Sequence, residues 1–260
     1  MNRRQLSKVL TLGVCSPWLT AHAQDLMSSV AKVKQSIVLV GTFKATNSPR
    51  FTLRGTGFVI GDGNFAVTNA HVIPEGQEKD PESKIVIQIR TGQNELQARV
   101  ATIVEIDKLR DLALLQFDGA AVPKLTLRDS DTVREGQSIA FMGFPIGGAL
   151  GFSPVTHRGI ISSITAITPP SSNSSQLNAR NVASLRSGVF NVFQLDATAY
   201  PGNSGGPMFD ADTGEVIGVI NMVFVKGTKE SALTNPSGIS YAIPSKYVME
   251  LLARHKSPAK

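Results

Sequence analysis

Cysteine and aromatic residues are scarce in this sequence, which has one Cys, one Trp and 6% aromatic residues among its 260. The only cysteine, Cys15, lies near the N-terminus. The remainder therefore has no disulfide, no cysteine-based metal site and no cysteine nucleophile. Beyond the N-terminal segment there is no run of about 18 apolar residues, so we expect no transmembrane helix. Basic residues do not gather in runs with aromatic residues between them, and nothing indicates a nucleic-acid partner.

The first 23 residues have the pattern of an export signal. Three basic and no acidic residues open the segment, an apolar stretch follows over residues 9–19, and residues 21–23 are Ala-His-Ala. This small-x-small pattern precedes a cleavage site, so we expect cleavage before Gln24 and a periplasmic or secreted protein. Removal of the signal would lower the net charge from +6 to about +3. A disordered cytoplasmic tail is the alternative, and the paired arginines leave the export route open.

The rest of the chain is rich in short apolar and β-branched runs separated by turns, which predicts an all-β fold. We expect two six-stranded antiparallel β-barrels with a short helix at each end, over residues 25–35 and 245–255. The predicted domains are 24–122 and 123–260, joined by a crossover at 121–134. Strands are expected at 37–43, 54–60, 65–68, 85–89, 96–106 and 112–117, and then at 137–141, 155–167, 189–195, 207–209, 216–225 and 238–242.

The strongest chemical motif is Gly-Asn-Ser-Gly-Gly-Pro at residues 202–207. A serine hydroxyl is a weak nucleophile that needs a neighbouring base. Gly202 has access to backbone conformations closed to other residues, so its N–H can point inward beside that of Ser204. Two such donors form an oxyanion hole. We therefore predict Ser204 as the nucleophile and the loop Gly202, Asn203, Ser204 as the oxyanion site, with an ordinary glycine-rich turn as the alternative.

Two further residues complete a possible set for acyl transfer. His71 follows a predicted strand, and histidine exchanges protons near neutral pH, as a general base must. Asp111 opens the apolar run at 112–115, where a carboxylate is unusual without a partner. Each has a plain alternative, a structural histidine and a turn aspartate. The order His, Asp, Ser distributes the three over both predicted barrels, and it argues against an esterase of the α/β-hydrolase type, which has the order Ser, acid, His.

These motifs resemble the trypsin-like serine proteases, and most closely their HtrA/Deg branch. The resemblance rests on Thr-Asn-Ala-His-Val at 68–72, Asp-Leu-Ala-Leu-Leu at 111–115 and the motif at 202–207, and it extends over roughly residues 30–250. Further agreement lies at residues 55–60, 143–145, 158–162, 217–221 and 241–244. The resemblance implies a chymotrypsin-like fold and a secreted or periplasmic serine endopeptidase. It also implies that His71 is the base, Asp111 the group that orients it, and Ser204 the nucleophile.

The resemblance also implies a substrate side to the site. Thr198 falls six residues before the nucleophile, at the base of the specificity pocket, and residues Ile220, Asn221 and Met222 fall on the strand that pairs with the substrate backbone. We expect small or medium apolar side chains before the cleaved bond. Asn203 carries no charge, so activation by an ion pair with a freed N-terminus is not expected.

The partners implied are unfolded or exposed polypeptides, cleaved without a metal or organic cofactor. The chain also departs from the branch, because the sequence ends shortly after the last predicted helix and no PDZ domain is expected. A long loop at residues 169–187 is unusual, and the trimer common in the branch is left open. A second hypothesis is a binding or chaperone-like module whose oxyanion loop is collapsed at rest.

Overall fold

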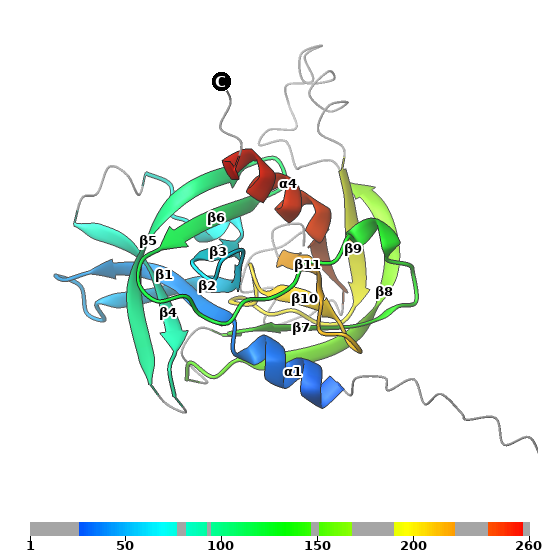
Figure 1. Cartoon of the computed structure of the whole chain (residues 1–260), viewed down its shortest axis with the longest axis horizontal. Coiled ribbons are helices and arrows are strands. Elements are labelled where there is room, and N and C mark those ends of the chain that lie inside the picture. Colours follow the sequence, from blue (N-terminus) through cyan, green and yellow to red (C-terminus); the bar gives the residue numbers. More distant parts are fainter. Residues whose placement is uncertain are drawn as a thin grey trace, which may run out of the picture.

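Two closed antiparallel barrels of six strands each lie side by side in the computed structural model (Figure 1). The structure describes residues 26–76, 82–92, 95–146, 151–167, 190–221 and 239–256. The predicted fold class is therefore confirmed. The predicted signal at residues 1–23 and the loop at 169–187 lie outside the described residues.

The first barrel has the strand order β1-β2-β3-β6-β5-β4. Alternate side chains of its strands point inward, and Val38, Val59, Ile87 and Leu115 are among those that fill the interior. Its strands are β1 (Ile37–Lys44), β2 (Phe51–Ile60), β3 (Phe65–Thr68), β4 (Ser83–Arg90), β5 (Leu96–Asp107) and β6 (Leu112–Phe117). The sequence therefore located all six, with β2 beginning three residues earlier than expected.

The second barrel has the strand order β10-β11-β12-β9-β8-β7 and its own interior, which includes Ile139, Phe141, Phe193 and Ile217. Its strands are β7 (Ser138–Gly143), β8 (Val155–Ile167), β9 (Phe190–Asp196), β10 (Pro207–Asp210), β11 (Val216–Asn221) and β12 (Ile239–Pro244). The predicted strand 216–225 is described as far as residue 221. The predicted domain boundary at 122/123 lies between β6 and β7 and stays a prediction.

A third apolar cluster joins the barrels, because strands at the junction bury both faces. Phe58 and Leu114 of the first barrel share it with Met142 and Phe209 of the second. Helix α4 (Ser245–Lys256) lies across the junction and buries Leu251 in the same cluster (Figure 1). Helix α1 (Leu26–Lys34) packs beside the second barrel. A continuous core of this kind holds the two barrels in one relative position.

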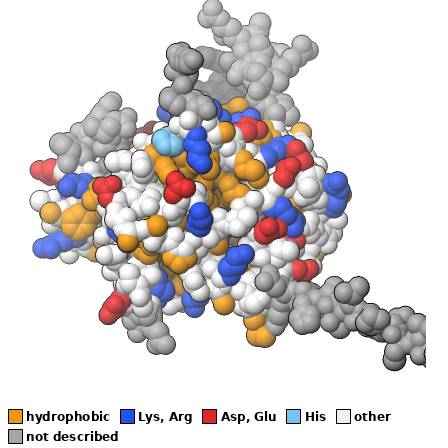
Figure 2. Space-filling view, in the orientation of Figure 1, with side chains coloured by type: hydrophobic (Ala, Val, Ile, Leu, Met, Phe, Trp, Pro, Cys, Tyr) orange, Lys and Arg blue, Asp and Glu red, His pale blue; other side chains and the backbone are white. Residues whose placement is uncertain are grey.

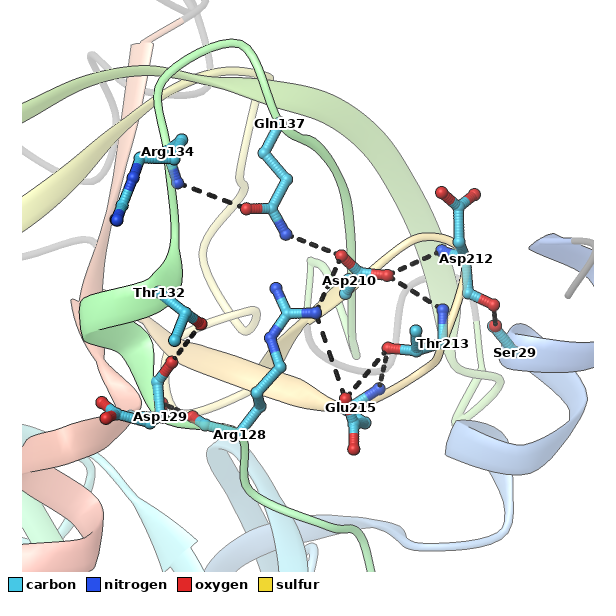
Figure 3. A network of polar contacts seen from close by, with 11 residues as sticks. Ser29, Arg128, Asp129, Thr132, Arg134, Gln137, Asp210, Asp212, Thr213 and Glu215 are labelled. Atoms are coloured by element: carbon cyan, nitrogen blue, oxygen red, sulfur yellow. Dashed lines mark hydrogen bonds and ion pairs between the residues drawn. The ribbon is translucent and has the colours of Figure 1, made fainter. Parts of the chain in front are cut away.

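A polar network around Asp210 ties the connection between the barrels to the second barrel (Figure 3). One carboxylate oxygen of Asp210 accepts from the N–H groups of Asp212 (3.1 Å) and Thr213 (2.9 Å). The other accepts from Gln137 Nε2 (2.6 Å) and Arg128 Nη1 (3.2 Å). Burial alone would raise the pKa of Asp210, but these hydrogen bonds and the Arg128 charge outweigh it and hold the pKa below its ordinary value.

The surface carries charges of both signs. Lys and Arg side chains are interspersed with Asp and Glu on the face shown in Figure 2. Among the described residues, no helix is long and apolar enough to cross a membrane. In the same part of the chain, no group of three or more His, Cys, Asp or Glu side chains is placed to hold a metal ion.

Candidate active site

The first barrel brings His71 and Asp111 together at the ends of two neighbouring strands. His71 lies in the 3₁₀ turn η1 (Ala70–Val72), which follows β3, and Asp111 is the residue before β6. Strands β3 and β6 are paired, with Thr68 opposite Ala113. Residues that flank these two strand ends are therefore neighbours in space, although 40 positions separate His71 from Asp111 in the chain.

The Asp111 carboxylate holds the imidazole from two directions. Its Oδ2 lies 2.6 Å from His71 Nδ1, and its Oδ1 accepts from the His71 backbone N–H at 2.8 Å. Donation from Nδ1–H leaves Nε2 as the free acceptor of the ring. Asp111 has a positive φ of 54°, a conformation that costs a non-glycine residue about 1 kcal/mol or more. Its carbonyl accepts from the Asn69 amide (3.0 Å) and the Ala70 N–H (3.1 Å), which hold it there.

Ser204 lies in the loop between β9 and β10 of the second barrel, against the first. Its carbonyl accepts from the N–H of Thr56 on β2 at 2.9 Å. The next residue, Gly205, has φ of 84°, and a Cβ there would clash with the Thr56 carbonyl and the Thr68 hydroxyl and lie 3.1 Å from the Asn69 nitrogen. Because Asn69 is two residues before His71, the turn that carries Ser204 lies against the segment that leads to His71. The Ser204 side chain is nearly buried, and among the described residues no hydrogen bond joins its hydroxyl to His71.

Asn221 connects the second barrel to the His71–Asp111 pair. It is the last residue of β11, it is fully buried, and its Nδ2 donates to Asp111 Oδ2 at 2.7 Å. Asp111 Oδ2 thus contacts both an imidazole from its own barrel and an amide from the other. A hydrogen bond to a carboxylate is worth about twice a neutral one, so this contact aligns the barrels where the predicted chemistry lies. Sequence reasoning placed Asn221 on the substrate side and did not foresee this bond.

The loop around Gly202 leaves two backbone donors without an acceptor inside the described protein, and they are the two that the sequence predicted. The carbonyl of Pro201 accepts from the Ile146 N–H (2.7 Å) and that of Gly202 from Thr56 Oγ1 (2.6 Å). Asn203 donates its N–H to Tyr200 and accepts from Gly206, both at 2.9 Å. The N–H groups of Gly202 and Ser204 remain, and Gly202 has a positive φ of 103°, which glycine adopts readily.

Thr56 supports this loop from the first barrel, a role that sequence reasoning missed. Its hydroxyl donates to the Gly202 carbonyl and accepts from the Phe144 N–H at 3.1 Å, so it joins two loops of the second barrel. The Thr68 hydroxyl donates to the Thr56 carbonyl at 2.7 Å. The signal lay in the Gly-Thr-Gly motif at residues 55–57, where a hydroxyl between two glycines on a buried strand needs a hydrogen-bond partner.

The residues predicted for the substrate side are only partly described. Thr198 is half-buried in the segment after β9, and the neighbouring N–H of Ala199 donates to Ser240 Oγ on β12 at 2.8 Å. Both backbone groups of Ile220 are already paired, with the N–H of Gly205 and the carbonyl of Gly206. Any pairing with a substrate backbone therefore has to come from residues after Ile220. Met222 lies outside the described residues, and these substrate-side assignments stay predictions.

A family model described as trypsin-like peptidase domain matches residues 55–219, a segment that contains His71, Asp111 and Ser204. A probable periplasmic serine endoprotease, DegP-like, from Marinomonas sp. (strain MWYL1) is 32% identical over 206 residues, which are 79% of this chain and 36% of the relative. The mitochondrial serine protease HTRA2 of Drosophila pseudoobscura pseudoobscura is 31% identical over 209 residues, 80% of this chain and 40% of its own length. The chain thus spans about two fifths or less of the length of these curated relatives.

The fold has matches among solved structures as well. The HtrA-type protease AlgW with a tripeptide superposes with a TM-score of 0.62 and 26% identity, over 88% of this chain and 63% of that one. The predicted resemblance to the HtrA/Deg branch is thereby confirmed, since relatives in sequence and in structure carry these names.

Proposed function

Since this chain belongs to the trypsin-like peptidase family, we propose that it is a serine endopeptidase that cleaves peptide bonds through Ser204, His71 and Asp111. The observation that carries the proposal is the loop at residues 201–204. Its carbonyls all point to partners within the protein, and the N–H groups of Gly202 and Ser204 stay available. Donors positioned in advance for a developing oxyanion are commonly the largest single contribution to acyl-transfer catalysis.

The geometry supports a two-stage reaction. Ser204 Oγ attacks the carbonyl carbon of the scissile bond while His71 Nε2 takes the hydroxyl proton. Asp111 keeps the other ring nitrogen as donor and stabilises the imidazolium that forms. The carbonyl oxygen becomes an oxyanion that accepts from the N–H groups of Gly202 and Ser204. His71 then gives its proton to the departing amine, and a water molecule, activated by the same imidazole, releases the acid from the acyl-enzyme.

Location and substrate follow from the sequence and the relatives together. An export signal at residues 1–23 and a relative named as a probable periplasmic protein favour action in the periplasm. We infer unfolded or exposed polypeptides as substrates, without metal or organic cofactor.

An uncharged Thr198 at the base of the specificity pocket favours small or medium apolar side chains before the cleaved bond. A trimer is a further inference from the resemblance to the HtrA branch.

One experiment tests the reaction. Mature protein is incubated with a fluorophosphonate probe and with unfolded casein, beside Ser204→Ala and a matched control, Ser162→Ala, whose serine is exposed on β8. We expect labelling and cleavage in the wild type and the control, and loss of both in Ser204→Ala. A wild type that binds casein but is never labelled would replace this proposal with the binding module whose loop is collapsed at rest.

A further inference from the structure

The second histidine of the described barrels, His157, lies against the oxyanion loop. It is on β8, opposite Phe141 of β7, and its ring stacks on the Phe141 ring with centroids 4.7 Å apart and planes 16° apart. The centroid of the Tyr200 ring lies 6.0 Å from that of the His157 ring, and the two ring planes are tilted by 41°. Burial lowers the pKa of His157, because a charged ring loses solvation between these aromatic groups.

His157 contacts the residue that lies between the two oxyanion donors. Its Nε2 is 3.3 Å from Nδ2 of Asn203, and Asn203 is fully buried. An amide nitrogen has only hydrogens to offer, so His157 Nε2 acts as the acceptor and the ring is neutral with its proton on Nδ1. Asn203 directly follows Gly202 and directly precedes Ser204, so a force on its side chain acts on both donor N–H groups.

The Asn203 side chain has no spare room in which to respond to a change in the ring. Its Oδ1 is buried and lacks a hydrogen-bond partner in the described protein, and a Cβ at Gly143 would come within 2.6 Å of it. Protonated His157 would present a donor to the Asn203 donor. The amide could relieve this by rotating its oxygen toward the ring, which would move Nδ2 to the buried position that Oδ1 now holds. Either arrangement replaces the present contact between the His157 ring and the Asn203 side chain.

We propose that His157 is a positioning residue that holds Asn203, and through it the N–H donors of Gly202 and Ser204, in the working arrangement while its ring is neutral, and that protonation of the ring releases this hold. The proposal rests on the proposed function, since the oxyanion donors matter only if acyl transfer occurs. It makes the oxyanion loop sensitive to acid separately from the general base.

Among the described residues, no charged side chain shifts the pKa of the His157 ring. Strand β7 presents Phe141 to the ring, and the loop before Ser204 presents Asn203 and Tyr200. No charge of the described chain shifts the pKa of His157, which is lowered by burial. Protonation of the ring itself is therefore the event that the contact responds to.

The test compares the acid limb of kcat/KM for a peptide ester in the wild type and in His157→Gln. Glutamine offers an oxygen to the Asn203 amide and does not titrate. We expect a similar rate for both near pH 8 and, as the pH falls, a wild-type limb that is one proton steeper than that of His157→Gln. The acid limb of His157→Gln should have the slope of a single protonation. His255→Gln is the matched control, because that ring lies on α4 against Phe65, far along the chain from the loop.

A second variant, His157→Leu, removes the acceptor at every pH. We expect kcat to fall about tenfold or more near pH 8 with little change in KM, since oxyanion contacts form in the transition state. Thermal melting controls for folding of the variant. Equal acid limbs for wild type and His157→Gln, or full kcat in a folded His157→Leu, would overturn the positioning role. A wild type that is inactive and unlabelled near pH 8 would instead remove the proposed function, so the two failures are distinct.

Discussion

Two carboxylates, Asp111 in the first barrel and Asp210 in the second, have similar surroundings by simple measures. Their side chains are 15% and 11% exposed. Asp111 accepts hydrogen bonds from His71 twice and from Asn221, and Asp210 accepts from two backbone N–H groups, Gln137 and Arg128. Each therefore satisfies the demand of a partly buried charge for several donors.

The donors distinguish the two roles. Asp210 is paired with a permanently charged guanidinium and with groups of its own turn, an arrangement that stabilises the fold (Figure 3). Asp111 is paired with an imidazole, which gains and loses a proton, and with an amide from the opposite barrel. Burial and the number of hydrogen bonds do not separate a structural aspartate from one that we propose for the reaction, whereas the chemistry of the partners does.

The largest effect is expected for Asp111→Asn. An amide at this position cannot hold the imidazole with its proton on Nδ1, so kcat should fall by about 10⁴-fold. The free energy of unfolding should change little by comparison. Steady-state kinetics together with urea unfolding measures both. A loss of stability that matches the loss of activity would make Asp111 a structural residue like Asp210.

Asp210→Ala should do the reverse. It leaves Arg128 and two backbone N–H groups without their acceptor, so the free energy of unfolding should fall by about 3 kcal/mol. Because this network lies outside the site, kcat for the folded fraction should stay near the wild-type value. Urea unfolding and active-site titration with the fluorophosphonate probe separate the two quantities. A drop in kcat per titrated site would show that the network also shapes the site.

Asn221→Ala removes the contact between the barrels at Asp111. A hydrogen bond to a charged group contributes about 2 kcal/mol, so kcat should fall by about tenfold to thirtyfold. Asn221→Gln tests whether any amide suffices, because the longer side chain cannot place its amide nitrogen where Nδ2 of Asn221 lies. Unchanged kcat in Asn221→Ala would mean that His71 alone orients the carboxylate.

The smallest effect is expected for stability in acid. The pKa of Asp210 in the folded protein lies below its ordinary value of 3.8, so the unfolded chain binds the proton more readily. The stability contributed by Asp210 is thus complete above that ordinary pKa and is lost as pH falls through the lower folded pKa. Urea unfolding of wild type and Asp210→Asn across this range measures it. The difference between them should shrink as the pH falls, and a constant difference would contradict the assignment.

Local patterns predicted a large part of this molecule. The β-branched runs located twelve strands, because a strand with a buried face needs apolar residues at regular positions. The motifs around residues 71, 111 and 204 could also be recognised locally, because each is a short run of neighbouring residues in the chain. The contacts of Thr56, Asn221 and His157 were not recognisable, because each joins residues that are 46 to 146 positions apart.

The sequence by itself determined which chemical groups are present: a hydroxyl in a glycine-rich loop, an imidazole after one strand and a carboxylate before another. Only the tertiary structure decided how these groups meet. The core shared by the barrels brings the two sets of strand ends together, and hydrogen bonds from Thr56 and Asn221 hold them in register. The physical reason is that hydrogen bonds act over about 3 Å, and only the packed chain brings distant segments that close.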